Sequence, residues 1–195
     1  IGRFEQLRRY DSFIDNKTVD HAALGIEILF NDGLIELFEI DKQYYSLIKT
    51  AIFNHNKYEI EPDLDNHTYL HCQIIRDGDK IDIFNTGLLE SFEAFLDVSQ
   101  NVLENDMISD DIFETFMQQQ TILSINRKTD LDRWVSFLAL VFGLNFTYSF
   151  EYVSKHSFLE KLIRRLDYKN PDSKIKMGQI ENCCKSYLKD KVDSI

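Results

Sequence analysis

Apolar residues recur at the helical period along most of the chain. In residues 20–30 they stand at i, i+3, i+4, i+7 and i+8, as His21, Leu24, Gly25, Ile28 and Leu29. These positions share one face of a helix, and Thr18 is placed to cap its start. The same spacing predicts helices near 44–55, 67–84, 91–102, 110–124, 131–144, 149–168 and 176–192. Strand signals are weak throughout, so the pattern predicts an all-α protein.

Polar breaks separate the predicted helices at residues 31–33, 61–63, 85–87 and 170–172, and no internal repeat is present. A chain of 195 residues fits one domain. We expect that domain to span 1–195, with a helical core over 1–104 and a helical extension over 105–195. Aromatic and apolar stripes in the extension face the core or, alternatively, a second copy in a homodimer: Phe113, Phe116, Met117, Trp134, Phe137, Leu138, Val141 and Phe142.

The charge balance narrows the classes of partner. The 22 basic and 33 acidic residues give a formal net charge of -11, which argues against a general nucleic-acid-binding surface. A small phosphorylated ligand stays compatible with this charge if positive side chains gather where it binds. The 3 cysteines indicate reduced thiols and a cytoplasmic protein. The uncharged stretch 134–150 has polar residues that favour a buried helix, so no membrane partner is expected.

Two histidines and an acidic segment are the candidates for chemistry. His21 opens the apolar face of one predicted helix and His55 closes that of another, although either could be an ordinary core histidine. The segment 76–82 carries Asp77 and Asp79, which lie about 200° apart on a helix and cannot both face one site. The apolar spacing leaves open which of them faces inward, and a solvated helix face is the alternative. Two imidazoles and one carboxylate suit a transition-metal, Mn²⁺ or Fe²⁺ site that activates water.

Four segments, in this order, resemble the HD-domain superfamily of metal-dependent phosphohydrolases. They are Ile-Gly-Arg-Phe-Glu-Gln at 1–6, Asp-His-Ala-Ala-Leu-Gly at 20–25, Ala-Ile-Phe-Asn-His-Asn at 51–56 and Arg-Asp-Gly-Asp-Lys-Ile-Asp at 76–82. The resemblance implies an HD-like helical bundle and a divalent metal (Mn, Fe, Ni, Co, Zn or Mg) bound by His21, His55 and Asp79. Asp77 would then be a supporting or structural residue. The resemblance also implies that the namesake His-Asp dyad immediately precedes Ile1.

The resemblance further implies hydrolysis of a nucleotide or another small phosphate ester or diester by a metal-activated water. Arg3 and Lys80 would hold the phosphate, and His21 would protonate the leaving oxygen. Asn56 stands where many relatives with two metals have a second histidine, which favours an alternative. In that alternative the chain is a catalytically inactive binding or regulatory module that keeps the fold. A purely structural bundle, in which His21, His55 and Asp79 lie far apart, is a third possibility.

Overall fold

The computed structural model describes residues 1–193, apart from the side chain of Asn16, and every regular element in this range is helical. The predicted all-α class is therefore confirmed. The elements are α1 (Gly2–Tyr10), η1 (Asp15–Lys17), α2 (His21–Ile26), η2 (Glu27–Asn31), η3 (Leu34–Leu37), η4 (Lys42–Tyr44), α3 (Tyr45–Asn54), α4 (Asn66–Leu89), α5 (Phe92–Leu96), α6 (Gln100–Asn105), α7 (Asp110–Met117), η5 (Ser124–Asn126), α8 (Asp130–Leu138), η6 (Ala139–Gly143), α9 (Thr147–Lys155), α10 (Phe158–Ile163) and α11 (Pro171–Asp193).

The chain divides into two compact units, which we call unit 1 (residues 1–76) and unit 2 (residues 77–195). The division falls inside α4, so the first half of that helix belongs to unit 1 and the second half to unit 2. The apolar spacing contains no sign of a division there, because it continues without interruption through residues 67–84.

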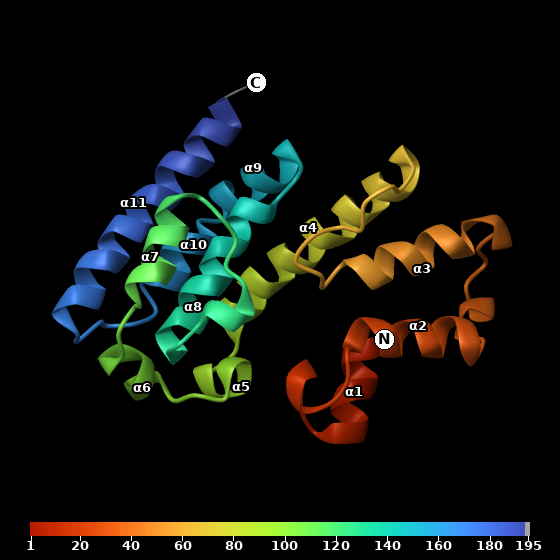
Figure 1. Cartoon of the computed structure of the whole chain (residues 1–195), viewed down its shortest axis with the longest axis horizontal. Helices are drawn as coiled ribbons and strands as arrows, with labels where there is room; N and C mark the ends of the chain where they lie inside the picture. The colour runs from red at the N-terminus through yellow and green to blue at the C-terminus, as the bar shows by residue number, and fades with distance from the viewer. Residues whose placement is uncertain (194–195) are drawn as a thin grey trace. The chain divides into compact units, whose positions relative to one another are not determined.

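In unit 1, α2 packs against both α1 and α3 (Figure 1). The contact of α1 with α2 depends on Gly2, where an added β-carbon would overlap the carbonyl oxygen of His21. Gly2 is thus the residue that lets the two helices approach backbone to backbone. Asp20, not Thr18, caps α2: its carboxylate accepts from the N–H groups of Ala22 and Ala23. The expected Thr18 cap is wrong because the hydroxyl of Thr18 donates to the carbonyl of Ile14.

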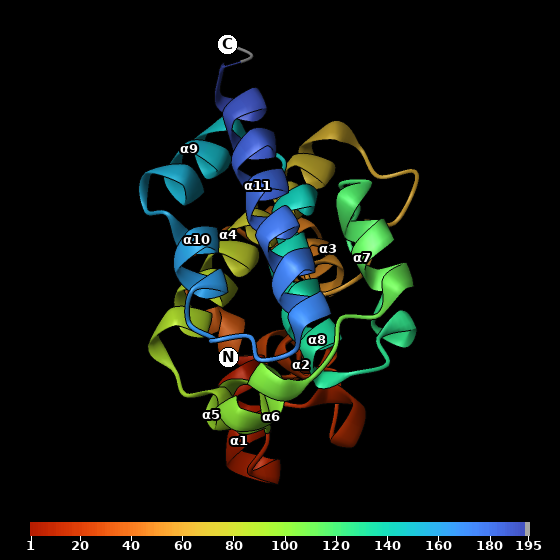
Figure 2. The ribbon, with the colours of Figure 1, turned by 90° about the vertical axis from the view of Figure 1, so that its left-hand side faces the viewer.

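In unit 2, α11 packs against α7, α9 and α10, and Figure 2 shows it running between α7 on one side and α9 and α10 on the other. These helices enclose one continuous apolar cluster that extends along the chain from Phe84 to Leu188. Trp134 and Phe116 belong to this cluster, with exposed fractions of 1% and 0%. Most of the predicted apolar stripes are therefore core, whereas Met117 is exposed.

Several predicted helices are shorter than the apolar spacing suggested. Asp97 and Ser157 have positive φ angles, 60° and 50°, and they separate α5 from α6 and α9 from α10. The polar break expected at 85–87 is also wrong. Here the helix is longer than predicted, because α4 continues to Leu89. Gly87 is buried there against Leu162 and Phe95, so it is a close-packing residue in a helix and not a turn.

Residues 134–150 form the buried end of α8, then η6 and the start of α9, in agreement with a helix that belongs to the core. Among the described residues, no helix combines the length and apolar character needed to cross a membrane. The three cysteines are free thiols: Cys72 and Cys184 are buried and Cys183 is half-buried.

Candidate metal centre

His21 is the first residue of α2 and is almost fully buried. Its Nδ1 atom lies 2.8 Å and 3.0 Å from the two carboxylate oxygens of Asp15, which begins the short helix η1. A buried imidazole needs hydrogen-bond partners for its ring nitrogens, because burial without them costs free energy. Asp15 supplies the partner on one side of the ring.

His55 supplies the partner on the other side. It caps the carboxyl end of α3, and its Nε2 atom lies 2.8 Å from Nε2 of His21, with the two rings at 79°. Its Nδ1 atom lies 2.6 Å from the carbonyl oxygen of Ile52 in the preceding turn. The structure thus brings together two residues that are 34 positions apart in the chain.

The protonation pattern of this pair makes it a candidate for chemistry. A carboxylate and a carbonyl oxygen can only accept hydrogen bonds, so Nδ1 of each ring must donate its proton. A neutral imidazole carries one N–H, and therefore each Nε2 atom holds a lone pair directed at the other. Two lone pairs repel one another at 2.8 Å unless the rings share a proton or both bind a metal ion.

The donor set fits a divalent metal ion. Metal-binding histidines in proteins usually donate the second ring N–H to a carboxylate or backbone carbonyl, as His21 and His55 do to Asp15 and Ile52. The two Nε2 atoms, 2.8 Å apart, are the atoms that would hold such an ion.

A third donor atom stands next to His55 in the chain. The side-chain oxygen Oδ1 of Asn56 is buried, and no hydrogen-bond donor lies within reach of it in the described part of the chain. The orientation of this amide is determined, because its nitrogen donates to a carboxylate oxygen of Asp20 at 2.9 Å. The residue that follows His55 thus carries a buried carbonyl oxygen that could accept a bond or bind a cation.

Asp15 is held as an anion by its neighbours. Its oxygen Oδ1 accepts from the guanidinium of Arg3 at 2.9 Å and from the amide of Gln6 at 3.0 Å. Partial burial acts to raise the pKa of Asp15, but the hydrogen bonds from His21 and Gln6 and the charge of Arg3 outweigh it, and the pKa is lowered. Arg3 also donates to the carbonyl of Phe13, always through Nη1. Asp15 is therefore a charged residue that orients His21.

Asp20 connects the two histidine-bearing helices. One oxygen accepts from Asn56, and the other accepts from Lys57 at 2.8 Å, so the residues after α3 are tied to the start of α2. Burial acts to raise the pKa of Asp20, but the bonds from Lys57, Asn56 and the backbone N–H groups of Ala23 and Ala22 lower it well below its usual range.

Asp15, Asp20 and His21 also form a cluster whose ligand atoms lie within 4.8 Å of one another. The oxygens of Asp20 are already engaged by two backbone N–H groups, an amide and an ammonium. Nδ1 of His21 is engaged by Asp15. The pair of Nε2 atoms is consequently a better place for an ion than this cluster.

Arg76 supports the loop that follows His55. Its guanidinium is buried and donates to the carbonyls of Asn54 at 2.8 Å, Lys57 at 2.5 Å and Tyr58 at 2.9 Å. The side chain of Asn54 adds bonds to the carboxylate and N–H of Glu61 in the same loop. The backbone at His55 is thus held from both sides.

The other predicted site residues belong to unit 2. Asp77 is buried and accepts from the backbone N–H groups of Asn145 and Phe146 and from the side chain of Asn145, which holds the start of α9. Its role there is structural. Asp79 is half-buried. Lys80 is buried with its stem against Gly143. The assignment of Asp79 as a metal ligand and of Lys80 as a phosphate-binding residue stays a prediction.

Sequence reasoning identified His21 and His55 but missed the residues that orient them. Gln6 and Arg76 lie inside the segments that carried the family resemblance, but the resemblance assigned no role to either residue. Asp15 lies outside all four segments and had no signal of its own.

Comparisons with models of protein families, with curated proteins and with solved structures find no match.

Proposed function

We propose that this protein is a metal-dependent phosphohydrolase whose centre includes His21 and His55. The observation that carries the proposal is the separation of 2.8 Å between the two Nε2 atoms, in rings that are both oriented by acceptors at Nδ1. The orphaned oxygen of Asn56 supports it. The reaction class rests on the resemblance of the four sequence segments to the HD-domain superfamily.

A divalent cation held by the two imidazoles would supply Lewis acidity and a nucleophile at neutral pH. The residues of the chain would orient the metal ligands and bind the phosphate. Asp15 fixes the tautomer of His21, and Arg3 and Gln6 keep Asp15 charged and in place. Within the described part of the chain, Arg3 makes its bonds through Nη1, and its Nε and Nη2 would donate to a phosphate oxygen. The expected substrate is a small phosphate ester or diester, such as a nucleotide.

The first experiment measures metal affinity. The protein is stripped with a chelator and titrated with Mn²⁺ by calorimetry, as wild type, as His55→Ala and as His67→Ala. His67 is an exposed histidine of unit 1 that contacts His71, and it serves as the matched control. Loss of a direct ligand should weaken binding by about a hundredfold or more, whereas the control should bind as the wild type does. Equal affinity in all three proteins would contradict the metal centre. A proton shared between the two imidazoles would then be the remaining explanation of their close approach.

The second experiment measures turnover. The metal-loaded protein is tested against nucleotides and other small phosphate esters, with release of inorganic phosphate as the readout. Activity that disappears in His55→Ala and persists in His67→Ala supports the enzyme. Metal binding without turnover on any of these compounds would favour the regulatory module.

A further inference from the structure

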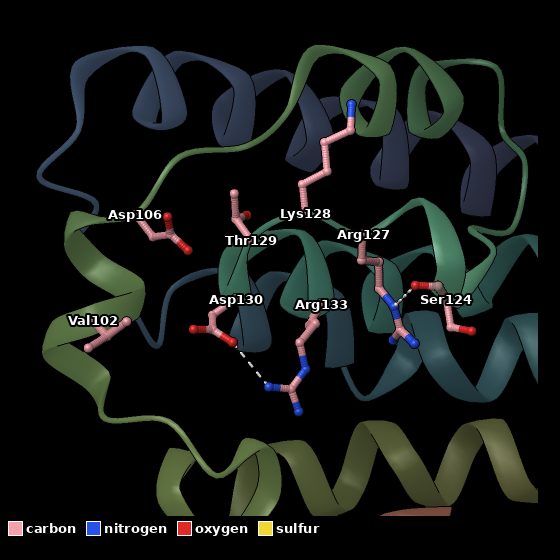
Figure 3. Close-up of a pocket in the computed structure, with 8 residues that line it drawn as sticks. All are labelled: Val102, Asp106, Ser124, Arg127, Lys128, Thr129, Asp130 and Arg133. Carbon is pink, nitrogen blue, oxygen red and sulfur yellow. Dashed lines mark hydrogen bonds and ion pairs between the residues drawn. The ribbon is translucent and has the colours of Figure 1, made fainter. Parts of the chain in front are cut away.

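Unit 2 contains a pocket with a volume of about 500 Å³ beside the start of α8 (Figure 3). All of its lining residues belong to unit 2, and three of them are cations: Arg127, Lys128 and Arg133. The volume lies in the range of ~300–1,000 Å³ that is typical of pockets for small molecules. Two carboxylates, Asp106 and Asp130, line the pocket as well, so its formal charge is +1 in a chain whose formal net charge is -11.

The two arginines point the same way. In Figure 3 their guanidinium groups extend to the same side of the α8 ribbon. Arg127 donates to the carbonyl of Ser124 at 3.1 Å and to the hydroxyl of Ser136 at 3.2 Å. Burial, and after it the nearby charge of Arg133, lower the pKa of Arg127. The protonated Arg127 therefore lies in a place that disfavours its charge, and an anion bound there would relieve this cost.

The acidic residues of the pocket are already engaged. Asp130 pairs with Arg133 at 3.1 Å, and Asp106 accepts from the backbone N–H of Leu131 at 3.0 Å. Lys128 pairs with Asp111 at 2.7 Å. Within residues 1–193, no carboxylate lies within ion-pair distance of Arg127. The pocket consequently contains a half-buried positive charge without a counter-charge.

The wall that carries these cations is held in place by its own hydrogen bonds. The buried carboxylate of Asp132 accepts from the backbone N–H groups of Ser109, Lys128 and Thr129. The side chain of Thr129 accepts in return from the N–H of Asp132 and donates to the carbonyl of Met107. Because these bonds occupy N–H groups at the start of α8, a ligand would be held by the arginine side chains and not by the helix end.

We propose that this pocket binds a small phosphate monoester, whose phosphate oxygens are held by Arg127 and Arg133. A guanidinium presents a planar set of donors that matches the oxygens of a phosphate group. A phosphate monoester carries a charge of about -1.5 to -2 near neutral pH, which the uncompensated charge of Arg127 would offset in part, while Arg133, paired with Asp130, would add hydrogen-bond donors. The remaining volume has room for the organic part of the molecule. This site rests on unit 2 alone and does not depend on the metal centre.

The test is calorimetric titration with inorganic phosphate and with AMP. The protein is treated with a chelator first, so that no metal ion can bind phosphate. Wild type, Arg127→Gln and Arg133→Gln are compared with Arg164→Gln, an exposed arginine of unit 2 that pairs with Glu181 and serves as the control. We expect one saturable site that binds AMP at least as tightly as phosphate. The affinity should fall by about ten- to a hundredfold in either pocket variant and stay unchanged in the control.

Arg127→Gln also loses the bond to Ser136 and could disturb folding, so circular dichroism is recorded for each variant. Arg133→Gln, whose partner is the surface residue Asp130, keeps the test valid if Arg127→Gln does not fold. The proposal is overturned if the wild type shows no saturable binding of either compound, or if folded Arg133→Gln binds as tightly as the wild type. Binding of citrate in place of phosphate would also overturn it, because the pocket would then recognise carboxylates.

Discussion

The two units of the molecule are held together by different forces. Unit 2 buries a continuous apolar cluster from Phe84 to Leu188. Unit 1 buries few large apolar side chains, among them Leu24, Leu29 and Ile35, and leaves others such as Phe4 and Leu37 exposed. It instead buries polar groups that bond to one another around the two histidines. Apolar burial is non-directional, whereas hydrogen bonds fix distances and angles.

This difference affects how precisely each unit can position polar side chains. A site that must hold two Nε2 atoms 2.8 Å apart needs directional support, and unit 1 provides it through Asp15, Asp20 and Arg76. Unit 2 is stabilised largely by close apolar packing, for example around Trp134. Residues that break either kind of support should therefore have different consequences, which substitutions in the two units can measure.

The largest effect is expected from a phenylalanine in the core of unit 2. Phe116→Ala removes a side chain that is 0% exposed and packs on Phe142, so unfolding should become easier by about 3–5 kcal/mol. Phe4→Ala, in α1 of unit 1, removes a side chain that is 79% exposed and should change stability by less than about 0.5 kcal/mol. Urea unfolding measures both, followed by the fluorescence of the one tryptophan, Trp134, and by circular dichroism. Similar losses from the two substitutions would show that the contrast between the units is wrong.

A smaller effect is expected from the buried guanidinium of unit 1. Arg76→Met keeps much of the side-chain volume but removes the guanidinium that donates to the carbonyls of Asn54, Lys57 and Tyr58. The expected loss of stability is about 2–4 kcal/mol. Hydrogen exchange measured by mass spectrometry should become faster in a peptide that covers 44–60, while a peptide from α11 serves as the internal reference.

Arg76→Lys is the matched variant, because it keeps the positive charge but lacks the planar guanidinium whose several N–H groups reach three carbonyls. The free energy of unfolding of Arg76→Lys should lie between those of the wild type and Arg76→Met. If Arg76→Met leaves both the stability and the exchange of 44–60 unchanged, the polar network is not what holds unit 1.

The same contrast explains how much could be predicted from the sequence. The helical class and the core residues Phe116, Trp134 and Leu138 were accessible, because apolar spacing directly reports which face of a helix is buried. The ends of the helices were less accessible. Asp97 and Ser157 adopt left-handed backbone angles, which are usually predicted from a glycine in the sequence. Gly87 was expected in a turn, but it is a close-packing residue inside α4.

The candidate site was accessible only in part for a related reason. His21 and His55 occupy positions on apolar faces, so the helical period indicated that they point inward. Asp15 acts through a hydrogen bond made by a short 3₁₀ helix outside the periodic segments, and no pattern of spacing reports such a bond. The identity of the buried carboxylate in 76–82 was also open on a helix, and contacts with Asn145 and Phe146, far along the chain, determine that it is Asp77.

The smallest effect is expected from an ion pair of unit 2. Glu181 on α11 accepts from Lys185 at 2.7 Å and from Arg164, which follows α10, at 2.8 Å. The hydrogen bond from Lys185 is the main cause that lowers the pKa of Glu181 below its usual 4.5. Burial opposes this effect, and Arg164 adds to it. Both cations are largely exposed, so Glu181→Gln should cost less than about 1 kcal/mol at pH 7.

The dependence on pH gives this last prediction its sign. Because the pKa of Glu181 is lower in the folded protein, its contribution is complete at pH values well above 4.5 and is lost as the pH falls through the folded-state value. The difference in stability between wild type and Glu181→Gln should therefore be small at pH 7 and should shrink further as the solution is acidified below pH 4.5. Urea unfolding followed by Trp134 fluorescence across this range measures it. A difference at pH 7 as large as that of Arg76→Met would mean that polar bonds support unit 2 as strongly as they support unit 1.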